Sequence, residues 1–147
     1  MIRSNTSSGC IFCNIINGKA PCWKVYEDNL VIAFFDIHPE AEGHILVVPK
    51  KHFKDIFDVE EKYIKRAAVV CKRLSLALNK ALGIKDINII HGSGKNAQQD
   101  VFHFHMHIWP RRKGDTIKLQ YVPQKGIPPR FDILLERIKK YIPQPNN

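Results

Sequence analysis

Three histidines stand at every second position of the segment "VFHFHMHIWP", residues 101–110. Successive side chains of a β-strand point to opposite faces, so His103, His105 and His107 would share one face of a strand. The segment is rich in strand-favouring residues, and Pro110 ends it. An amphipathic strand with a solvated face is the alternative, but such a face normally mixes Thr, Lys, Glu and Ser. The spacing therefore predicts a functional site made of three imidazoles. The opposite, buried face would carry Phe104, Met106 and Ile108.

A second group with metal-binding chemistry lies near the N-terminus. Cys10 and Cys13 form a Cys-x-x-Cys pair, whose thiolates can hold one zinc ion. Such a pair also occurs in redox motifs or by accident, and a zinc site needs two further ligands. His52 and His103 are candidates on separate elements, although spacing alone does not select His52 over His44. Two sulfurs and two nitrogens would suit tetrahedral zinc, which would pin the N-terminal turn to the sheet.

The elements that must position these residues follow from hydrophobic periodicity and turn signals. We expect a short helical turn within residues 9–18, a hairpin of residues 23–27 and 30–37, and further strands at 43–50, 87–92 and 101–110. Residues 92–99, "GSGKNAQQ", should form a loop. The fold class expected is α+β with an antiparallel sheet of about five strands.

Two longer helices are expected. The pattern of residues 58–82 has helical spacing, with Asp58 and Glu61 resembling a capping box and Gly83 suited to a C-cap. A C-terminal helix should cover residues 131–141, after a long connection over residues 113–129. Its apolar face would carry Leu134, Leu135, Ile138 and Tyr141.

Length and composition indicate one domain in a chain of 147 residues, with a core over about 9–113 and a C-terminal extension over about 114–147. No apolar run is long enough to span a membrane, and the first ten residues lack the apolar core of a signal peptide. Few cysteines and no disulfide pattern favour a reducing, cytoplasmic location. The net charge of +9 suits a nucleotide or another anion. Because the cations are scattered, we expect no nucleic-acid partner.

The segment "HFHMHIWPR" resembles the signature of the histidine triad (HIT) superfamily, in which His alternates with apolar residues. The N-terminal half, "GCIFCNIINGKAPCWKVYEDNLVIAFFDIHPEAEGHILVVPKKH", is similar to the Hint branch, especially its zinc-carrying bacterial-type members. The resemblance covers about residues 9–113. It implies a nucleotidyl hydrolase or transferase that splits a bond at the α-phosphate of a purine nucleotide, such as an AMP or GMP derivative. It also implies a homodimer paired through the central helix and an edge strand.

The resemblance assigns roles residue by residue. His105 would be the nucleophile that forms a covalent nucleotidyl-histidine, and His107 and His44 would orient the site and contact the phosphate or leaving group. Asp36 would bind the ribose hydroxyls, and Gln99 is retained from the phosphate loop. Structural zinc would be held by Cys10, Cys13, His52 and His103. An apolar clamp on the base would consist of Phe12, Ile15 and Ile37, although each could equally be core.

The loop before the triad departs from the family pattern. Gly92 stands where a phosphate-binding Asn is common, Gln98 replaces Gly, and Asp100 replaces a Ser or Thr that donates to phosphate. A carboxylate beside a phosphate is repulsive and offers no donor. The nucleophile is unaffected, but the substrate and leaving group are left open. A nucleoside phosphoramidase is the main hypothesis. The alternatives are a dinucleoside polyphosphate hydrolase of the fragile histidine triad type and a catalytically weak nucleotide-binding or scaffold protein.

Overall fold

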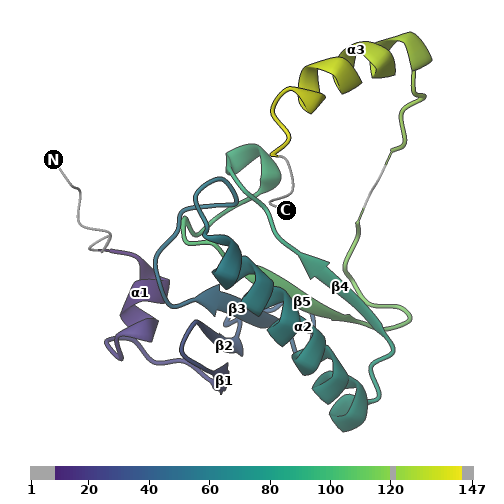
Figure 1. Cartoon of the computed structure of the whole chain (residues 1–147). Coiled ribbons are helices and arrows are strands. Elements are labelled where there is room, and N and C mark those ends of the chain that lie inside the picture. Colours follow the sequence, from purple (N-terminus) through teal and green to yellow (C-terminus); the bar gives the residue numbers. More distant parts are fainter. Residues whose placement is uncertain (1–8, 120–121, 144–147) are drawn as a thin grey trace, which may run out of the picture. The chain divides into compact units, whose positions relative to one another are not determined.

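The computed structural model describes residues 9–119 and 122–143. Residues 1–8 and 144–147 at the termini and residues 120–121 in the predicted connection lie outside it. The chain divides into two compact units, Met1–Ile117 and Lys118–Asn147. The first unit contains the sheet with helices α1 and α2, and the second contains helix α3 (Figure 1). The α+β class with a five-stranded antiparallel sheet is confirmed. No helix among the described residues is long and apolar enough to cross a membrane.

The sheet has the strand order β1-β2-β3-β5-β4, and every neighbouring pair is antiparallel. The strand bounds are β1 Lys24–Glu27, β2 Val31–Phe35, β3 Ile45–Pro49, β4 Asp86–Ile90 and β5 Met106–Arg111. β1 and β4 are therefore the edges, and β3 and β5 are adjacent in the middle. This places the histidine segment beside the strand that follows His44.

Alternation along the central strands divides the core between the two sheet faces. Helix α2, Glu61–Leu82, packs on one face against residues that include Ile45, Val47 and Ile108. Helix α1, Ile11–Ile16, packs on the other face, where Phe12 meets Leu46 and neighbouring apolar side chains. His107 is the register partner of Leu46, so it belongs to the α1 face. The α1 face is therefore the one that carries the site.

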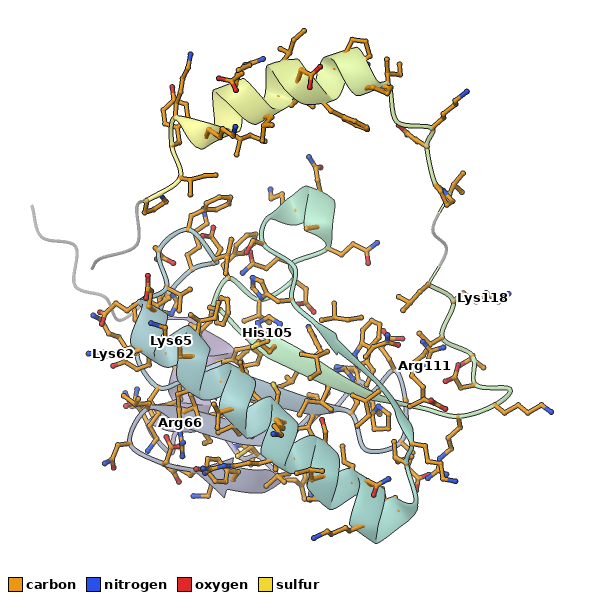
Figure 2. The ribbon with its side chains drawn as sticks, turned by 45° about the vertical axis from the view of Figure 1, so that its right-hand side comes forward. Lys62, Lys65, Arg66, His105, Arg111 and Lys118 are labelled. Carbon is orange, nitrogen blue, oxygen red and sulfur yellow. The ribbon has the colours of Figure 1, made fainter. Side chains whose placement is uncertain are left out.

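The β1–β2 turn is held by Asp28. Its carboxylate accepts the backbone N–H groups of Leu30 and Val31 at 2.8 and 2.9 Å. Arg66 of α2 donates to the same carboxylate at 2.6 Å and to the hydroxyl of Tyr26 at 2.6 Å. Figure 2 shows Arg66 on α2, one turn beyond Lys62. These bonds tie the turn to the helix that covers the opposite face of the sheet from the site.

The start of α2 differs from the sequence prediction. The N-cap residue is Glu60, with no side-chain cap bond, so the proposed capping box of Asp58 and Glu61 is wrong. Asp58 instead accepts the backbone N–H groups of Lys54 and Asp55, because the chain makes a separate turn there. The C-terminal prediction is confirmed, since Gly83 has φ of +67° and its N–H donates to the carbonyl of Asn79 at 2.9 Å.

The fifth strand is shorter than predicted. Regular pairing begins at Met106, so residues 101–105 precede β5 rather than forming part of it. There the chain follows the segment after β3, and the N–H of Phe104 donates to the carbonyl of Phe53 at 2.6 Å. Side-chain alternation nevertheless persists, because Phe104 and Ile108 are fully buried and Met106 packs on the α2 core.

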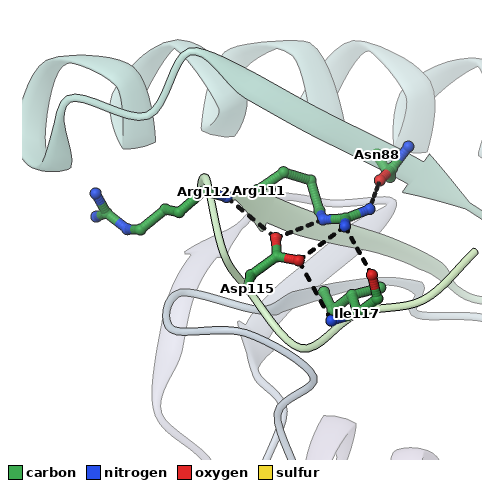
Figure 3. A network of polar contacts seen from close by, with 5 residues as sticks. All are labelled: Asn88, Arg111, Arg112, Asp115 and Ile117. Carbon is green, nitrogen blue, oxygen red and sulfur yellow. Dashed lines mark hydrogen bonds and ion pairs between the residues drawn. The ribbon is translucent and has the colours of Figure 1, made fainter.

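The end of β5 is fixed by a polar network around Arg111 (Figure 3). Its guanidinium binds both carboxylate oxygens of Asp115 at 2.7 and 2.8 Å, the side-chain oxygen of Asn88 at 2.7 Å and the carbonyl of Ile117 at 2.9 Å. A planar guanidinium suits such a bidentate pair. The network connects β5, β4 and the following loop.

The second unit contains helix α3, Pro128–Lys139. It begins three residues before the predicted start at 131, because Pro128 and Pro129 suit a first helical turn. It ends two residues before the predicted end at 141. The apolar side chains predicted to share one face, Leu134, Leu135, Ile138 and Tyr141, are all exposed.

Candidate functional site

His105 is buried and is oriented by a backbone hydrogen bond. Its ring is 3% exposed, and Nδ1 lies 2.7 Å from the carbonyl oxygen of His103. A carbonyl only accepts, so Nδ1 carries the proton and Nε2 keeps its lone pair. Burial lowers the pKa of His105, which keeps the ring neutral near pH 7. The geometry therefore yields an imidazole prepared as a nucleophile.

His107 and His44 form a coupled pair beside it. His44 Nε2 lies 2.9 Å from His107 Nδ1, and Asp36 Oδ2 lies 3.7 Å from the same His44 nitrogen. Burial, helped by the neighbouring His105 and His44, lowers the pKa of His107 to about 3. Burial also lowers the pKa of His44, against the opposing effect of Asp36.

Two further donors surround His44. The backbone N–H of Glu40 lies 3.1 Å from Nδ1, and the indole N–H of Trp109 lies 3.0 Å from Nε2. Because both groups can only donate, an imidazolium at His44 would face a donor at each nitrogen. This arrangement favours the neutral ring for a reason separate from burial. Trp109 was not recognised from the sequence, although it stands two residues after His107 and would share its face.

A cavity of about 910 Å³ opens beside these histidines. His105, His107 and Asp36 line it, together with all three residues expected to clamp a base, Phe12, Ile15 and Ile37. The sequence prediction missed Trp23, which also lines it and is 68% exposed. His44 is not among the lining residues and lies behind His107. The cavity thus has an apolar wall, the carboxylates of Asp36 and Asp100, and the two neutral imidazoles of His105 and His107 beside the more exposed His38.

Gln99 does not reach this cavity. Its side chain is 6% exposed, accepts the N–H of Gly94 at 2.8 Å and donates to the carbonyl of Lys54 at 2.6 Å and that of Val101 at 3.2 Å. These bonds close the loop before the triad onto the segment after β3. The contacts support a role in shaping the loop, and the predicted nucleotide contact stays a prediction.

The structure shows where the three unusual loop residues, Gly92, Gln98 and Asp100, lie. A Cβ at position 92 would collide with the carbonyl oxygen of Ala97, so this path of the loop requires Gly92. Gln98 has φ of +61°, a left-handed conformation that suits Gly. It ends the short 3-10 helix η1, Lys95–Ala97. Asp100 lines the cavity.

His91 anchors His105 from outside the cavity. Its Nδ1 lies 2.7 Å from the carbonyl oxygen of His105, and its Nε2 lies 2.6 Å from Ser93 Oγ, which accepts the N–H of Ile56 at 2.9 Å. The ring also packs on Phe104, with centroids 4.3 Å apart. Sequence reasoning missed His91, because only the fold brings the end of β4 beside the triad.

The predicted metal ligands come together in a separate cluster. The ligand atoms of Cys10, Cys13, His52 and His103 all lie within 4.8 Å of one another. Sulfur-to-nitrogen distances are 3.4 Å for Cys10–His103, 3.6 Å for Cys13–His103 and 3.3 Å for Cys13–His52. A tetrahedral zinc ion with usual bond lengths separates such ligands by about 3.5 Å. The donor set therefore fits zinc.

The orientation of His103 supports the same conclusion. Its Nε2 lies 2.9 Å from the carbonyl oxygen of Pro49 and so carries the proton, which leaves the Nδ1 lone pair directed toward the thiols. Backbone bonding of the outer nitrogen is the usual arrangement for a metal-binding histidine. The structure thus selects His52 over His44, the choice that spacing left open.

Comparison with known proteins agrees with this geometry. The HIT domain model matches residues 17–114. An uncharacterized HIT-like protein of Borreliella burgdorferi is 46% identical over 108 residues, covering 72% of this chain and 78% of that protein. A crystal structure of a HIT family protein from Bacillus anthracis has a TM-score of 0.88 and 32% identity, covering 94% of this chain and all of that one. The chain belongs to the HIT domain family.

Some relatives have names that describe an activity or a metal. The adenosine 5'-monophosphoramidase HNT1 of Saccharomyces cerevisiae is 38% identical over 105 residues, 71% of this chain and 64% of that protein. The adenylylsulfatase HINT3 of Arabidopsis thaliana is 36% identical over 117 residues, 78% of this chain and 58% of that protein. A zinc-bound histidine triad protein from Mycobacterium smegmatis has a TM-score of 0.73 and 38% identity, covering 81% of this chain and 86% of that one.

Proposed function

We propose that the protein is a purine nucleoside phosphoramidase that works through a covalent nucleotidyl-His105 intermediate. The observation that carries the proposal is the buried, neutral His105, whose Nδ1–H is committed to the carbonyl of His103 at 2.7 Å. A relative named as an adenosine monophosphoramidase supports the substrate class. Asp36 would accept the ribose hydroxyls, and the apolar wall would hold the base.

The first step forms one bond and breaks one. His105 Nε2 attacks the α-phosphorus, and the phosphorus–nitrogen bond to the leaving group breaks. Glu40 and Trp109 cannot both donate to a neutral His44, and in the tautomer in which Glu40 donates to Nδ1, His44 Nε2 carries the proton and does not accept from Trp109. His44 Nε2–H then donates to His107 Nδ1, so His107 carries its proton on Nε2. That proton would pass to the departing nitrogen, and one proton taken up by the His44–His107 pair beside the anionic phosphate would leave His107 as a neutral ring with a free Nε2 lone pair. His107 thereby acts as the general acid.

The second step regenerates the enzyme. Water attacks the phosphorus, the bond to His105 breaks, and the now basic His107 Nε2 takes the proton of the water. The products are the nucleoside monophosphate and an amine. Two steps replace one difficult displacement, which is the advantage of a covalent intermediate.

The test is substitution of the nucleophile. His105→Ala should abolish release of AMP from an adenosine phosphoramidate while leaving AMP binding and the fold intact, because the lost nitrogen forms a bond only during reaction. Mass spectrometry of quenched wild-type protein should find an adenylyl group on the peptide that contains His105. Undiminished hydrolysis by the variant would contradict the proposal.

A second candidate is a dinucleoside polyphosphate hydrolase. The cavity volume of about 910 Å³ favours it, because this lies near the upper end of the range for ligand pockets, about 300–1,000 Å³. The negative charge of Asp100 opposes it, because the departing polyphosphate would be repelled. Offering a dinucleoside polyphosphate in the same assay distinguishes the two.

We further propose a structural zinc ion and a cytoplasmic location. The Cys10, Cys13, His52 and His103 cluster would hold the ion, and a zinc-bound histidine triad relative supports it. Zinc would stabilise the fold there and would take no part in the reaction. A site that needs two thiolates also favours a reducing compartment.

We also propose a homodimer formed through α2 and β4. β4 is an edge strand with Ile89 exposed, and α2 exposes Val69 and Leu76. Pairing two β4 edges would cover an otherwise open row of backbone groups. Light scattering at micromolar concentration should give twice the chain mass of 17.0 kDa. A mass near that of one chain would contradict the proposal.

A further inference from the structure

A second hollow lies beside the cavity. It has a volume of about 560 Å³, and its lining includes Lys54 and Phe102 on one part and the proposed zinc ligands Cys10 and His52 on another. Ile11, Asp100 and Val101 line both spaces, so Asp100 stands at their boundary. Asp36 and the proposed base-clamping residues Phe12, Ile15 and Ile37 line only the first. A nucleotide bound along that wall with its phosphorus at His105 would leave the boundary at Asp100 as the route to the second hollow.

Asp100 brings an available negative charge to this boundary. One carboxylate oxygen, Oδ1, accepts the N–H of Val101 at 2.8 Å, and no ion pair to Asp100 is found within residues 9–119 and 122–143. Lys54 lies over the ring of Phe102 at 5.8 Å instead. The charge also affects the histidines of the site. Asp100 acts to raise the pKa values of His105 and His107, although burial lowers them by more.

The charge of Asp100 opposes the binding of a phosphate unless the ligand compensates for it. A positively charged group on the leaving group would compensate, because it would attract the carboxylate of Asp100, which repels the phosphate. Among the residues that line the second hollow, Asp100 is the one carboxylate and Lys54 the one ammonium group, so a positively charged ligand would be attracted by Asp100 against the opposing charge of Lys54.

We propose that the second hollow receives the leaving group and that Asp100 selects amines that carry a second, positively charged group. This inference rests on the proposed function. When the phosphorus–nitrogen bond breaks, the departing nitrogen receives its proton from His107 Nε2. The remote ammonium keeps its charge throughout and remains beside Asp100. Phe102 supplies an apolar surface for the methylene chain between the two nitrogens.

The experiment compares two adenosine phosphoramidates whose leaving groups share a four-carbon chain and differ in a terminal amino group. One carries n-butylamine, and the other carries 1,4-diaminobutane attached through one nitrogen. Wild-type protein should show a value of kcat/KM about fivefold higher for the diamine, the upper range for an exposed ion pair. The preference should decrease as salt is raised, because screening weakens exposed pairs.

Asp100→Asn is the matched variant, since Asn retains an oxygen that can accept the N–H of Val101. It should bring the ratio close to one, partly by raising kcat/KM for the butylamine substrate. Glu61→Gln is the control, because it removes the same charge from the exposed start of α2 and should keep the wild-type preference.

Equal turnover of both substrates by the wild-type protein would overturn the leaving-group site but would not contradict the proposed phosphoramidase activity. The same preference in Asp100→Asn as in wild type would also overturn it. Absence of turnover with either substrate would overturn the proposed function, and the leaving-group inference with it.

Discussion

At the scale of single residues, backbone carbonyls set the chemistry of the imidazoles. His103 and His105 each commit one nitrogen to a carbonyl, that of Pro49 at 2.9 Å and that of His103 at 2.7 Å. Each therefore exposes one lone pair, His103 toward the thiols and His105 as the proposed nucleophile. Two chemically identical side chains, two positions apart, would thus have different functions, because His103 keeps its lone pair on Nδ1 beside the thiols and His105 keeps its lone pair on Nε2.

Buried neutral histidines make stability depend on pH. The pKa of His107 falls to about 3 in the folded protein, whereas an unfolded histidine titrates near 6.5. Between these values the unfolded chain binds a proton that the folded protein does not, so the free energy of unfolding decreases as pH falls. The contribution is complete above about pH 6.5 and is lost progressively toward pH 3. His44 and His105 act in the same direction, since burial lowers both pKa values.

We expect the urea midpoint to decrease between about pH 6.5 and pH 4.5, above the range in which most carboxylates titrate. His107→Gln has no imidazole to take up this proton. Its midpoint should therefore change less over the same interval. Urea unfolding followed by fluorescence at several pH values measures both proteins, and parallel curves would contradict the argument.

At the scale of elements, much of the site geometry follows from period-two alternation. His107 and Leu46 share a face because β3 and β5 pair in register, and Phe104 and Ile108 are buried on the other side as predicted. The sequence could not show that regular pairing begins only at Met106. That limit is set by the segment of Phe53, which takes the N–H of Phe104. Local periodicity predicts the direction in which side chains point, but it does not identify the strand that will pair with the segment.

Non-local contacts account for the residues that sequence reasoning missed. His91 and Trp109 reach His105 and His44 only because β4 and β5 are adjacent and β3 lies beside them. The capping box failed for a similar reason, since Asp58 found nearer N–H donors in its own turn. A motif of two residues cannot show which of several local hydrogen bonds will form.

The loop element η1 offers a test of backbone strain. Gln98 ends η1 with φ of +61°, which costs a non-glycine residue about 1–2 kcal/mol. Gln98→Gly should remove this cost, partly offset by about 0.4–1 kcal/mol from the greater freedom of the unfolded chain. We therefore expect the free energy of unfolding to rise by about 0.5 kcal/mol.

Asn96→Gly serves as the matched control for Gln98→Gly. Asn96 lies in the same short helix but is not among the described residues with positive φ, so glycine should only add freedom to the unfolded chain. Urea unfolding should show a loss of up to about 1 kcal/mol for this variant. A loss of stability in Gln98→Gly of equal size would mean that the left-handed conformation carries no strain.

At the scale of the whole molecule, the proposed zinc ion would connect parts that are far apart in the sequence. Its four ligands come from the start of α1, from the segment after β3 and from the segment before β5. α1 also carries Phe12 and Ile15, which line the cavity. Loss of the metal should therefore release α1 from the sheet and weaken the nucleotide site as well as the fold.

Protein purified without added metal should contain about one zinc per chain. Chelation should lower Tm by at least about 10 °C, because each kcal/mol of lost stability lowers Tm by about 2–8 °C in domains of this size range. Cys10→Ser should lose the zinc and match the chelated protein. Cys22→Ser should retain it, because Cys22 lies outside the cluster.

Chelated protein should also bind AMP more weakly in a calorimetric titration, and zinc should restore binding. Metal-free protein with an unchanged Tm would end the proposal, whereas loss of stability with unchanged AMP binding would show that α1 stays in place without the ion.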